Sequence, residues 1–184
     1  MKKALKRGFS LIETMIAISV LVLVITGPLT LAAQSLKAAS AAKNNLIAAN
    51  LAQEGIELIR LYRTNNILQG RGWMEGLLPP GPAECQSPAN GCYIDALNFD
   101  GSTQNFEIKN CSGGFYPNGC PLLKMNARNF YNYTSGNTTI FQRTIRLKKI
   151  DDDIVRINVT INWKGNTGGK SLSVEEIILN WLRL

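Results

Sequence analysis

The first pattern along the chain is a long apolar stretch close to the amino terminus. Residues 14–36 carry no charge, and the run 15–25 is interrupted only by Ser19. As an α-helix these 23 residues extend about 34 Å, which is enough to cross a hydrocarbon core of about 30 Å. Four basic residues precede the stretch: Lys2, Lys3, Lys6 and Arg7. Because basic flanks stay on the cytoplasmic side, the pattern predicts a transmembrane helix with a cytoplasmic amino terminus.

Two general explanations of this stretch compete: a cleaved secretory signal peptide and a plain single-span anchor. A signal peptide would be cut near residues 31–33, but Glu13 would lie inside its apolar region, which would also be too long. Neither explanation accounts for Glu13, five residues after Gly8 at the cytoplasmic edge of the span. A charge at the bilayer centre costs about 2.5–3.5 kcal/mol, and less nearer the interface, so we expect Glu13 to have a partner.

The helical pattern continues beyond the apolar stretch, from residue 34 to about residue 63, where no Pro occurs. Its polar residues form one narrow stripe: Asn50, Gln53, Glu57 and Arg60. Most of the remaining circumference is apolar, which predicts two partners, its own globular domain and neighbouring subunits. Burial in one larger core is the alternative. Glu54 falls among apolar positions, so we expect an ion pair with another subunit or with the protein's own sheet. Earlier in the helix, Gly27-Pro28 predicts a kink or local loosening.

The composition changes after residue 66, and Gly, Pro, Asn and Ser crowd the segment 69–137. This segment contains all four cysteines: Cys85, Cys92, Cys111 and Cys120. An even number of cysteines in an oxidising compartment predicts two disulfides, and zinc is disfavoured because Cys-x-x-Cys pairs and His are both absent. Of three possible pairings we favour Cys85–Cys92 with Cys111–Cys120, which would close short turns. Short strands are expected at 93–95 and 106–108, on either side of a turn at 100–101.

Regular β structure is predicted from residue 140 onward. The clearest strand is 155–163, in which apolar and polar residues alternate strictly. Strands at 140–148 and at about 172–182 flank it, with connections short enough for an antiparallel meander. Glu175 and Glu176 interrupt the alternation of the last strand, which leaves room for a bulge. Three strands with one apolar face need a cover, and the apolar side of the preceding helix is available.

Composition and charge restrict the function. The chain has no His, so it lacks the commonest general base and the commonest transition-metal ligand. An enzyme is therefore disfavoured, and neither a cofactor nor a metal is expected. The segment 151–153 is acidic, and we interpret it as a solvated turn rather than a calcium site. The net charge of +7 raises the alternative of a DNA or surface-ligand contact, for which four exposed lysines are candidates: Lys148, Lys149, Lys164 and Lys170.

The run Lys6-Arg7-Gly8 followed by Phe9-Ser10-Leu11-Ile12-Glu13 and an apolar span resembles the leader of the type IV pilin family, which includes the type II secretion pseudopilins. The resemblance implies cytoplasmic cleavage between Gly8 and Phe9 by prepilin peptidase, and N-methylation of Phe9. It also implies that Glu13 pairs with the amino terminus of a neighbouring subunit during assembly. Such pairing agrees with the physics, because opposite charges brought together in a low-dielectric setting cost less than either alone. Cleavage would leave 16 Lys and Arg against 13 Asp and Glu.

These patterns and the resemblance together imply an α+β, pilin-like fold in five segments: leader 1–8, transmembrane half-helix 9–36, amphipathic half-helix 37–64, cysteine-bearing insert 65–138 and three-stranded antiparallel sheet 139–184. The expected role is a minor pilin-like subunit of a type IV pilus or related filament. The alternatives are a type II secretion pseudopilin and a tip-located subunit that binds DNA or another ligand. The implied partners are prepilin peptidase, other pilin or pseudopilin subunits, an inner-membrane assembly platform, and membrane lipid before assembly. The implied location is the inner membrane, followed by an extracytoplasmic filament.

Overall fold

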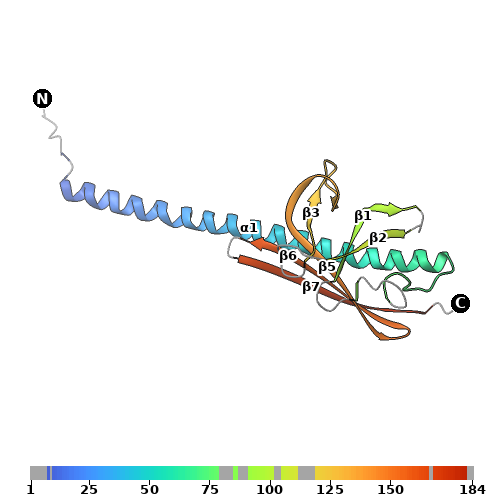
Figure 1. Cartoon of the computed structure of the whole chain (residues 1–184). Coiled ribbons are helices and arrows are strands. Elements are labelled where there is room, and N and C mark those ends of the chain that lie inside the picture. Colours follow the sequence, from blue (N-terminus) through green and yellow to red (C-terminus); the bar gives the residue numbers. More distant parts are fainter. Residues whose placement is uncertain are drawn as a thin grey trace, which may run out of the picture. The chain divides into compact units, whose positions relative to one another are not determined.

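The computed structural model describes residues 8, 10–78, 85–86, 91–101, 105–111, 119–165 and 168–181. The chain divides into two compact units, Met1–Asn44 and Asn45–Leu184. The elements within the described residues are labelled in Figure 1 and run in the following order: α1 Leu11–Leu68, β1 Cys92–Asp100, β2 Asn105–Asn110, β3 Leu122–Met125, β4 Tyr131–Asn132, β5 Asn137–Asp151, β6 Ile154–Gly165 and β7 Gly168–Leu179.

In the first unit, the described residues from Leu11 onward belong to α1. The carbonyl of Ser10 accepts hydrogen bonds from the backbone N–H groups of Glu13 (3.0 Å) and Thr14 (3.2 Å), which closes the first turn. The Glu13 carboxylate lies in that turn, where it complements the positive end of the helix dipole. α1 runs through Pro28 without interruption, so the loosening expected at Gly27-Pro28 does not end the helix.

In the second unit, β5 is the strand that joins the parts of the sheet. It pairs with β6 along one edge, and with β1 and β3 along the other. β2 and β4 extend the sheet beyond β1 and β3, β7 extends it beyond β6, and every pairing is antiparallel. Figure 1 shows β5, β6 and β7 as long neighbouring arrows. The predicted meander of three strands and the predicted hairpin around residues 100–101 are therefore both present.

Two details of the sheet differ from the sequence expectations. The last strand, for which the sequence left a bulge open, has none, because β7 pairs in unbroken register from Leu179, opposite Ile154, to Gly168. Glu176 instead takes an inward position, where its carboxylate forms an ion pair with Arg60 of α1, so the alternation of β7 is preserved. The sheet is also larger than three strands, because Cys92 of β1 pairs with Ile145 of β5 and joins the hairpin to the meander.

The hydrophobic core lies between the second half of α1 and the inner face of the sheet. β6 alternates buried and half-buried positions along most of its length, as predicted. The buried residues of α1 recur at helical spacing: Ala48, Leu51, Ala52, Gly55, Ile56, Leu58, Ile59, Tyr62 and Asn66. At Gly55 the helix comes so close to the sheet that a Cβ would lie 2.9 Å from Cγ1 of Val159. Glycine is therefore required at this contact for steric reasons.

The burial of α1 against the sheet bears on the two partners predicted for the amphipathic half of this helix. The predicted polar stripe is exposed, from Asn50 to Arg60. Most of the apolar residues on the remaining circumference are buried against the protein's own sheet, which is the first of the two predicted partners, while a contact with neighbouring subunits stays a prediction. Leu46 and Leu61 are exceptions, with 67% and 45% of their surfaces exposed.

Candidate functional site

The proposed processing site precedes the first turn of α1. Gly8 is exposed and non-helical, and among the described residues nothing lies within 4 Å of where its Cβ would be. Phe9, the other residue of the proposed scissile bond, lies outside the described residues. The bond therefore follows an uncrowded glycine just before the helix, a position that a peptidase can reach without unfolding a helical turn.

Glu13 is exposed on the first turn of α1. Within the part of the chain that the structure describes, no basic side chain lies within ion-pair distance of its carboxylate. The geometry therefore leaves this charge available to a group outside the described chain. It does not identify that group.

The following apolar stretch of α1 is exposed over its whole length. Its large apolar side chains have 50–77% of their surface exposed, and an 18-residue window within the helix reaches a mean hydropathy of 2.4 with none of it buried. By length and composition the helix can cross a membrane.

Among the five Ser and Thr hydroxyl groups of this stretch, most are satisfied within the helix. Four of them donate hydrogen bonds to backbone carbonyls three or four residues earlier: Thr14 to Leu11 (2.8 Å), Ser19 to Met15 (2.8 Å), Thr26 to Leu23 (3.3 Å) and Thr30 to Gly27 (2.7 Å). Such bonds lower the cost of placing hydroxyls in hydrocarbon, because lipid offers them no partner. The polar residues inside the span are thus compatible with lipid or with other apolar helices.

Glu54 has its ion-pair partner within the chain. Its Oε1 lies 3.1 Å from Nη1 of Arg143, a side chain on the inner face of β5 that is only 1% exposed. The same guanidinium donates hydrogen bonds to the carbonyls of Ile94 (3.1 Å) and Leu51 (3.4 Å). Glu54 therefore takes the second of the two alternatives, pairing with the protein's own sheet. Because the Glu54 side chain is still 35% exposed, an additional intersubunit contact stays a prediction.

Arg143 also organises the aromatic residues around it. Its guanidinium carbon lies 5.9 Å from the centroid of the Tyr133 ring, and that ring is 4.6 Å from the ring of Tyr93. Burial lowers the pKa of Arg143, but the neighbouring Tyr133 and Glu54 groups outweigh it and raise the pKa above its ordinary value. Burial also raises the pKa of the Tyr133 phenol. The Arg143 guanidinium is thus a permanent cation beside the neutral Tyr133 ring. Its contacts join the helix to the sheet.

Sequence reasoning did not single out Arg143, although a signal was present. The apolar positions Phe141, Ile145 and Leu147 alternate along β5 and place Arg143 on the same inner face. An arginine at an inward position predicts a buried carboxylate partner, and Glu54, the acid among apolar helix positions, was the matching signal.

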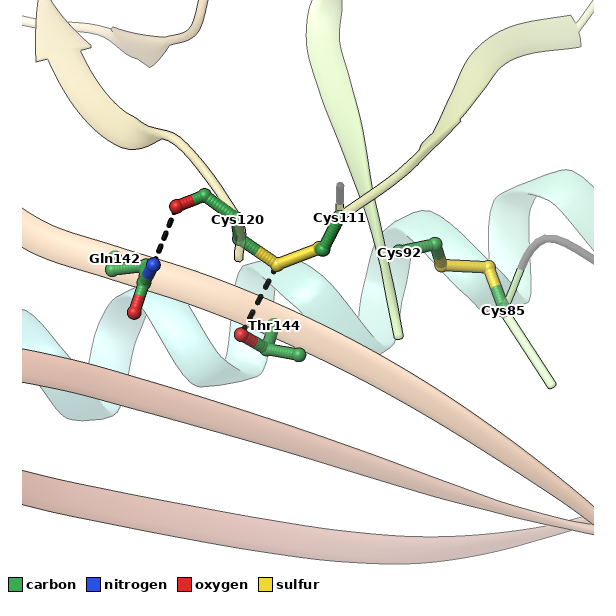
Figure 2. The surroundings of a disulfide bond; sticks show 6 residues. All are labelled: Cys85, Cys92, Cys111, Cys120, Gln142 and Thr144. Atoms are coloured by element: carbon green, nitrogen blue, oxygen red, sulfur yellow. Dashed lines mark hydrogen bonds between the residues drawn. A yellow bond between two sulfur atoms is a disulfide. The ribbon is translucent and has the colours of Figure 1, made fainter. Parts of the chain in front are cut away.

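The two disulfides are Cys85–Cys92 and Cys111–Cys120, the local pairing that the sequence favours. All four cysteines are buried. Figure 2 shows the Cys111–Cys120 bridge beside β5, with Gln142 and Thr144 reaching toward Cys120. Gln142 donates a hydrogen bond to the Cys120 carbonyl, and the Thr144 hydroxyl donates to its Sγ at 3.2 Å. Cys120, and through the disulfide also Cys111, is thus attached to the central strand.

The four candidate lysines do not form one surface. Lys148 and Lys149 are near the β5–β6 turn, and Lys149 pairs with Asp152. Lys164 and Lys170 are at the other end of β6. At about 3.4 Å per residue, the two pairs are about 27 Å apart along that strand. The acidic segment 151–153 spans the end of β5 and the β5–β6 turn, where Asp153 accepts hydrogen bonds from Asn180.

Residues 3–27 match the family model described as the prokaryotic N-terminal methylation motif. The match includes Gly8, Phe9 and Glu13 together with the first half of the apolar stretch, and it ends before the globular unit. No curated protein and no solved structure matches the chain. The motif is the mark of a structural class of protein that is typically non-enzymatic. With its apolar helix, antiparallel sheet and two disulfides, the chain carries the type IV pilin and pseudopilin signature on a pilin-like α+β fold.

Proposed function

We propose that the chain is a prepilin-like structural subunit that prepilin peptidase cleaves between Gly8 and Phe9. The mature protein, methylated at the Phe9 amine, then assembles as a minor subunit of a type IV pilus or a related filament. The observation that carries this proposal is the continuity of the methylation motif with an apolar stretch of helix whose large side chains are all at least half exposed. A soluble monomer would not leave such a surface in water, because burying it is strongly favourable.

The exposed half of α1 needs a cover at each stage of this scheme. Before assembly the cover is lipid, with the basic residues ahead of the span holding the amino terminus in the cytoplasm. After extraction from the bilayer the cover is the helices of neighbouring subunits, joined through the inner-membrane assembly platform. The apolar character that suits lipid also suits packing among helices, so one surface serves both states.

In this scheme Glu13 fixes how one subunit is aligned with the next. Cleavage creates a new cationic amine at Phe9, four residues before Glu13 in the same chain. We propose that the carboxylate of one subunit pairs with this amine of the next, which removes two uncompensated charges from an apolar setting. The absence of an ion-pair partner among the described residues supports this role.

The cysteine-bearing insert supports a minor rather than a bulk subunit, because it adds two disulfides and four strands to the sheet. A type II secretion pseudopilin is the second candidate, because the motif and the helix serve a periplasmic filament equally well. DNA capture at a filament tip is less well supported, since the four candidate lysines lie in two separate pairs.

The test is the isosteric Glu13→Gln variant, which removes the charge and keeps the shape. We expect it to enter the membrane and to be processed normally, but to be recovered from sheared surface or periplasmic filaments at about a tenth of the normal yield. Glu57→Gln is the matched control, since it removes a carboxylate from the exposed polar stripe of the same helix. Normal incorporation of the Glu13→Gln variant would refute the pairing role.

A further inference from the structure

The two ends of the meander formed by β5, β6 and β7 differ in charge. At the β5–β6 turn the acidic segment 151–153 supplies an ion-pair partner to Lys149. At the other end, where β6 leads into β7, Lys164 and Lys170 are both exposed. Neither of these two lysines forms an ion pair with any described residue. This end, which we call the lysine end, is therefore positively charged, whereas the opposite end carries both signs.

The lysine end is open, and its own strands bring no acid near it. Gly168 and Gly169 begin β7, and a Cβ added to either would meet no described atom within 4 Å. No Asp or Glu occurs in residues 154–174. Glu175 follows Lys170 by five positions, which is about 17 Å along the strand.

The acids of other segments are engaged or attached elsewhere. Glu54 of α1 pairs with Arg143 in the core. Glu84 lies outside the described residues and directly precedes Cys85, whose carbonyl accepts a hydrogen bond from the backbone N–H of Leu147, toward the β5–β6 turn. An anionic surface can therefore approach the lysine end without meeting a described acid.

The lysine end is level with the point where α1 enters the globular unit. Arg63 of α1 donates to the Leu179 carbonyl, and Arg60, earlier in the helix, pairs with Glu176, earlier in β7. Lys170 is six residues before Glu176, about 20 Å along the strand. The first residue of the unit is 15 residues before Arg60, about 22 Å along the helix. The two distances match, so both positions lie at the same end of the unit.

The membrane span keeps this end close to a bilayer. The uncharged stretch ends at Leu36, nine residues before Asn45, and α1 is helical throughout. The two residues are therefore at most about 14 Å apart, whatever the angle between the two units. Because the headgroup region extends roughly 5–7 Å beyond the hydrocarbon, the remaining gap is at most about 9 Å, close to the Debye length of about 8 Å. The intervening helix adds two exposed lysines, Lys37 and Lys43, and no acid.

We propose that the lysine end contacts anionic phospholipid headgroups of the bilayer in which α1 is anchored. A lysine close to an anionic membrane surface favours contact up to about fivefold, so two favour it up to about thirtyfold. That gain is too small to recruit a protein from solution, but the span makes the contact intramolecular, so the gain is sufficient to orient the globular unit. Nucleic acid would have to bind from solution through the same two cations, which favours lipid as the partner.

This inference rests on the membrane span of the proposed function, and not on the processing or the filament. The experiment uses the full chain in nanodiscs of phosphatidylcholine, with or without phosphatidylglycerol, and measures the acetylation rate of each lysine. We expect phosphatidylglycerol to slow acetylation of Lys164 and Lys170 at least about threefold, and high salt to remove the effect. Lys148, at the opposite end of the meander, should change by less than about 1.5-fold. Slow hydrogen exchange in residues 14–36 in both lipids measures insertion separately.

A pair of double variants separates the lysine end from general charge attraction. Lys164→Gln/Lys170→Gln should abolish the slowing of amide exchange that phosphatidylglycerol causes at the ends of β6 and β7. Lys148→Gln/Lys149→Gln, the matched control, removes two cations from the opposite end and should retain that slowing. Equal loss in both variants would overturn the proposal in favour of general attraction.

Three other results would also overturn the contact with anionic headgroups. The first is an acetylation rate of the lysine end that does not depend on phosphatidylglycerol. The second is protection of the lysine end by added single-stranded DNA but not by phosphatidylglycerol, which would assign it to nucleic acid. The third is fast exchange in residues 14–36 in every nanodisc, which would refute the membrane span and this inference together. Normal insertion with unprotected lysines would refute this inference alone.

Discussion

The two halves of α1 share one backbone conformation but have opposite surroundings. Between Leu11 and Leu36 every large apolar side chain is at least half exposed, whereas between Ala48 and Tyr62 most are buried against the sheet. The first half is apolar on all sides and satisfies four of its hydroxyls within the helix, while the second half has a polar stripe and an ion pair to a buried arginine. A continuous helix therefore does not imply a continuous environment.

This difference shows where each half obtains its stability. The second half depends on specific contacts with the sheet, so changes there should alter the stability of the globular unit. The first half makes no such contacts within the described chain, so changes there should alter membrane insertion or assembly instead. Each prediction below tests one side of this contrast, and unfolding is measured on the oxidised full chain in mild detergent.

The largest effect on stability is expected from Arg143→Met. The substitution leaves the Glu54 carboxylate and the Ile94 carbonyl without their buried donor. Because Glu54 is 35% exposed and can be partly hydrated, we expect a loss of about 2–4 kcal/mol in the free energy of unfolding, measured with urea. Arg128→Met, an exposed arginine in the turn after β3, should change it by less than about 0.5 kcal/mol. Equal effects of the two would contradict the role of Arg143.

The next largest loss of stability is expected when either disulfide is removed. Each bridge closes a short loop, with sequence separations of 7 and 9 residues, so replacing the cysteines of one pair by Ser should cost about 2–3 kcal/mol. Urea unfolding of each double variant measures this change. Hydrogen exchange in residues 14–36 should stay as in the parent, because the large side chains of that half of α1 are exposed. Altered exchange there would show that the two halves are coupled.

A pair of glycine substitutions compares the halves directly. At Gly55 a Cβ would lie 2.9 Å from Val159 and 3.2 Å from Cδ of Arg143, so Gly55→Ala should destabilise the globular unit by about 1–2 kcal/mol despite the better helix propensity of Ala. At Gly27 nothing lies within 4 Å, so Gly27→Ala should not destabilise it. Thermal unfolding of the two variants decides the point. Stabilisation by Gly55→Ala would mean that the helix is farther from the sheet.

The smallest effect is expected at the rim of the helix–sheet contact. Arg60 bonds to Glu176 and to Glu57, and the bond to Glu176 is the main cause of the raised pKa of Arg60. Because the Arg60 side chain is 46% exposed, Glu176→Gln should cost under about 1 kcal/mol. High salt should shrink the difference between the variant and the parent, as measured by urea unfolding. A difference that persists in high salt would indicate a packing role for Glu176.

Much of the fold could be predicted because its signals are local. The apolar stretch, the strict alternation of β6 and the short spacing of each cysteine pair correspond to the helix, the central meander and the local disulfides. β3 and β4 were not predicted, because strands of 4 and 2 residues are too short to show a period. Their pairing depends on contacts with β5 that lie far away in the sequence.

The candidate site could be predicted only in part. Gly8, Phe9 and Glu13 stand at fixed offsets in one contiguous motif, and the family model matches at the same residues. The partner of Glu54 could not be read from the sequence, because 89 residues separate it from Arg143 and the sheet register brings them together. The inward position of Glu176 was missed for the same reason, since its partner Arg60 is on the helix.

The central claim, that the chain is processed as a pilin-type precursor, is tested most directly by the intact mass of the protein from cells with and without prepilin peptidase. The account predicts that the protein from peptidase-containing cells lacks residues 1–8, begins at Phe9 and carries the mass of one added methyl group. In cells without the peptidase, residues 1–8 should remain. A mature protein that begins at any other residue, or the same mass in both kinds of cell, would contradict it.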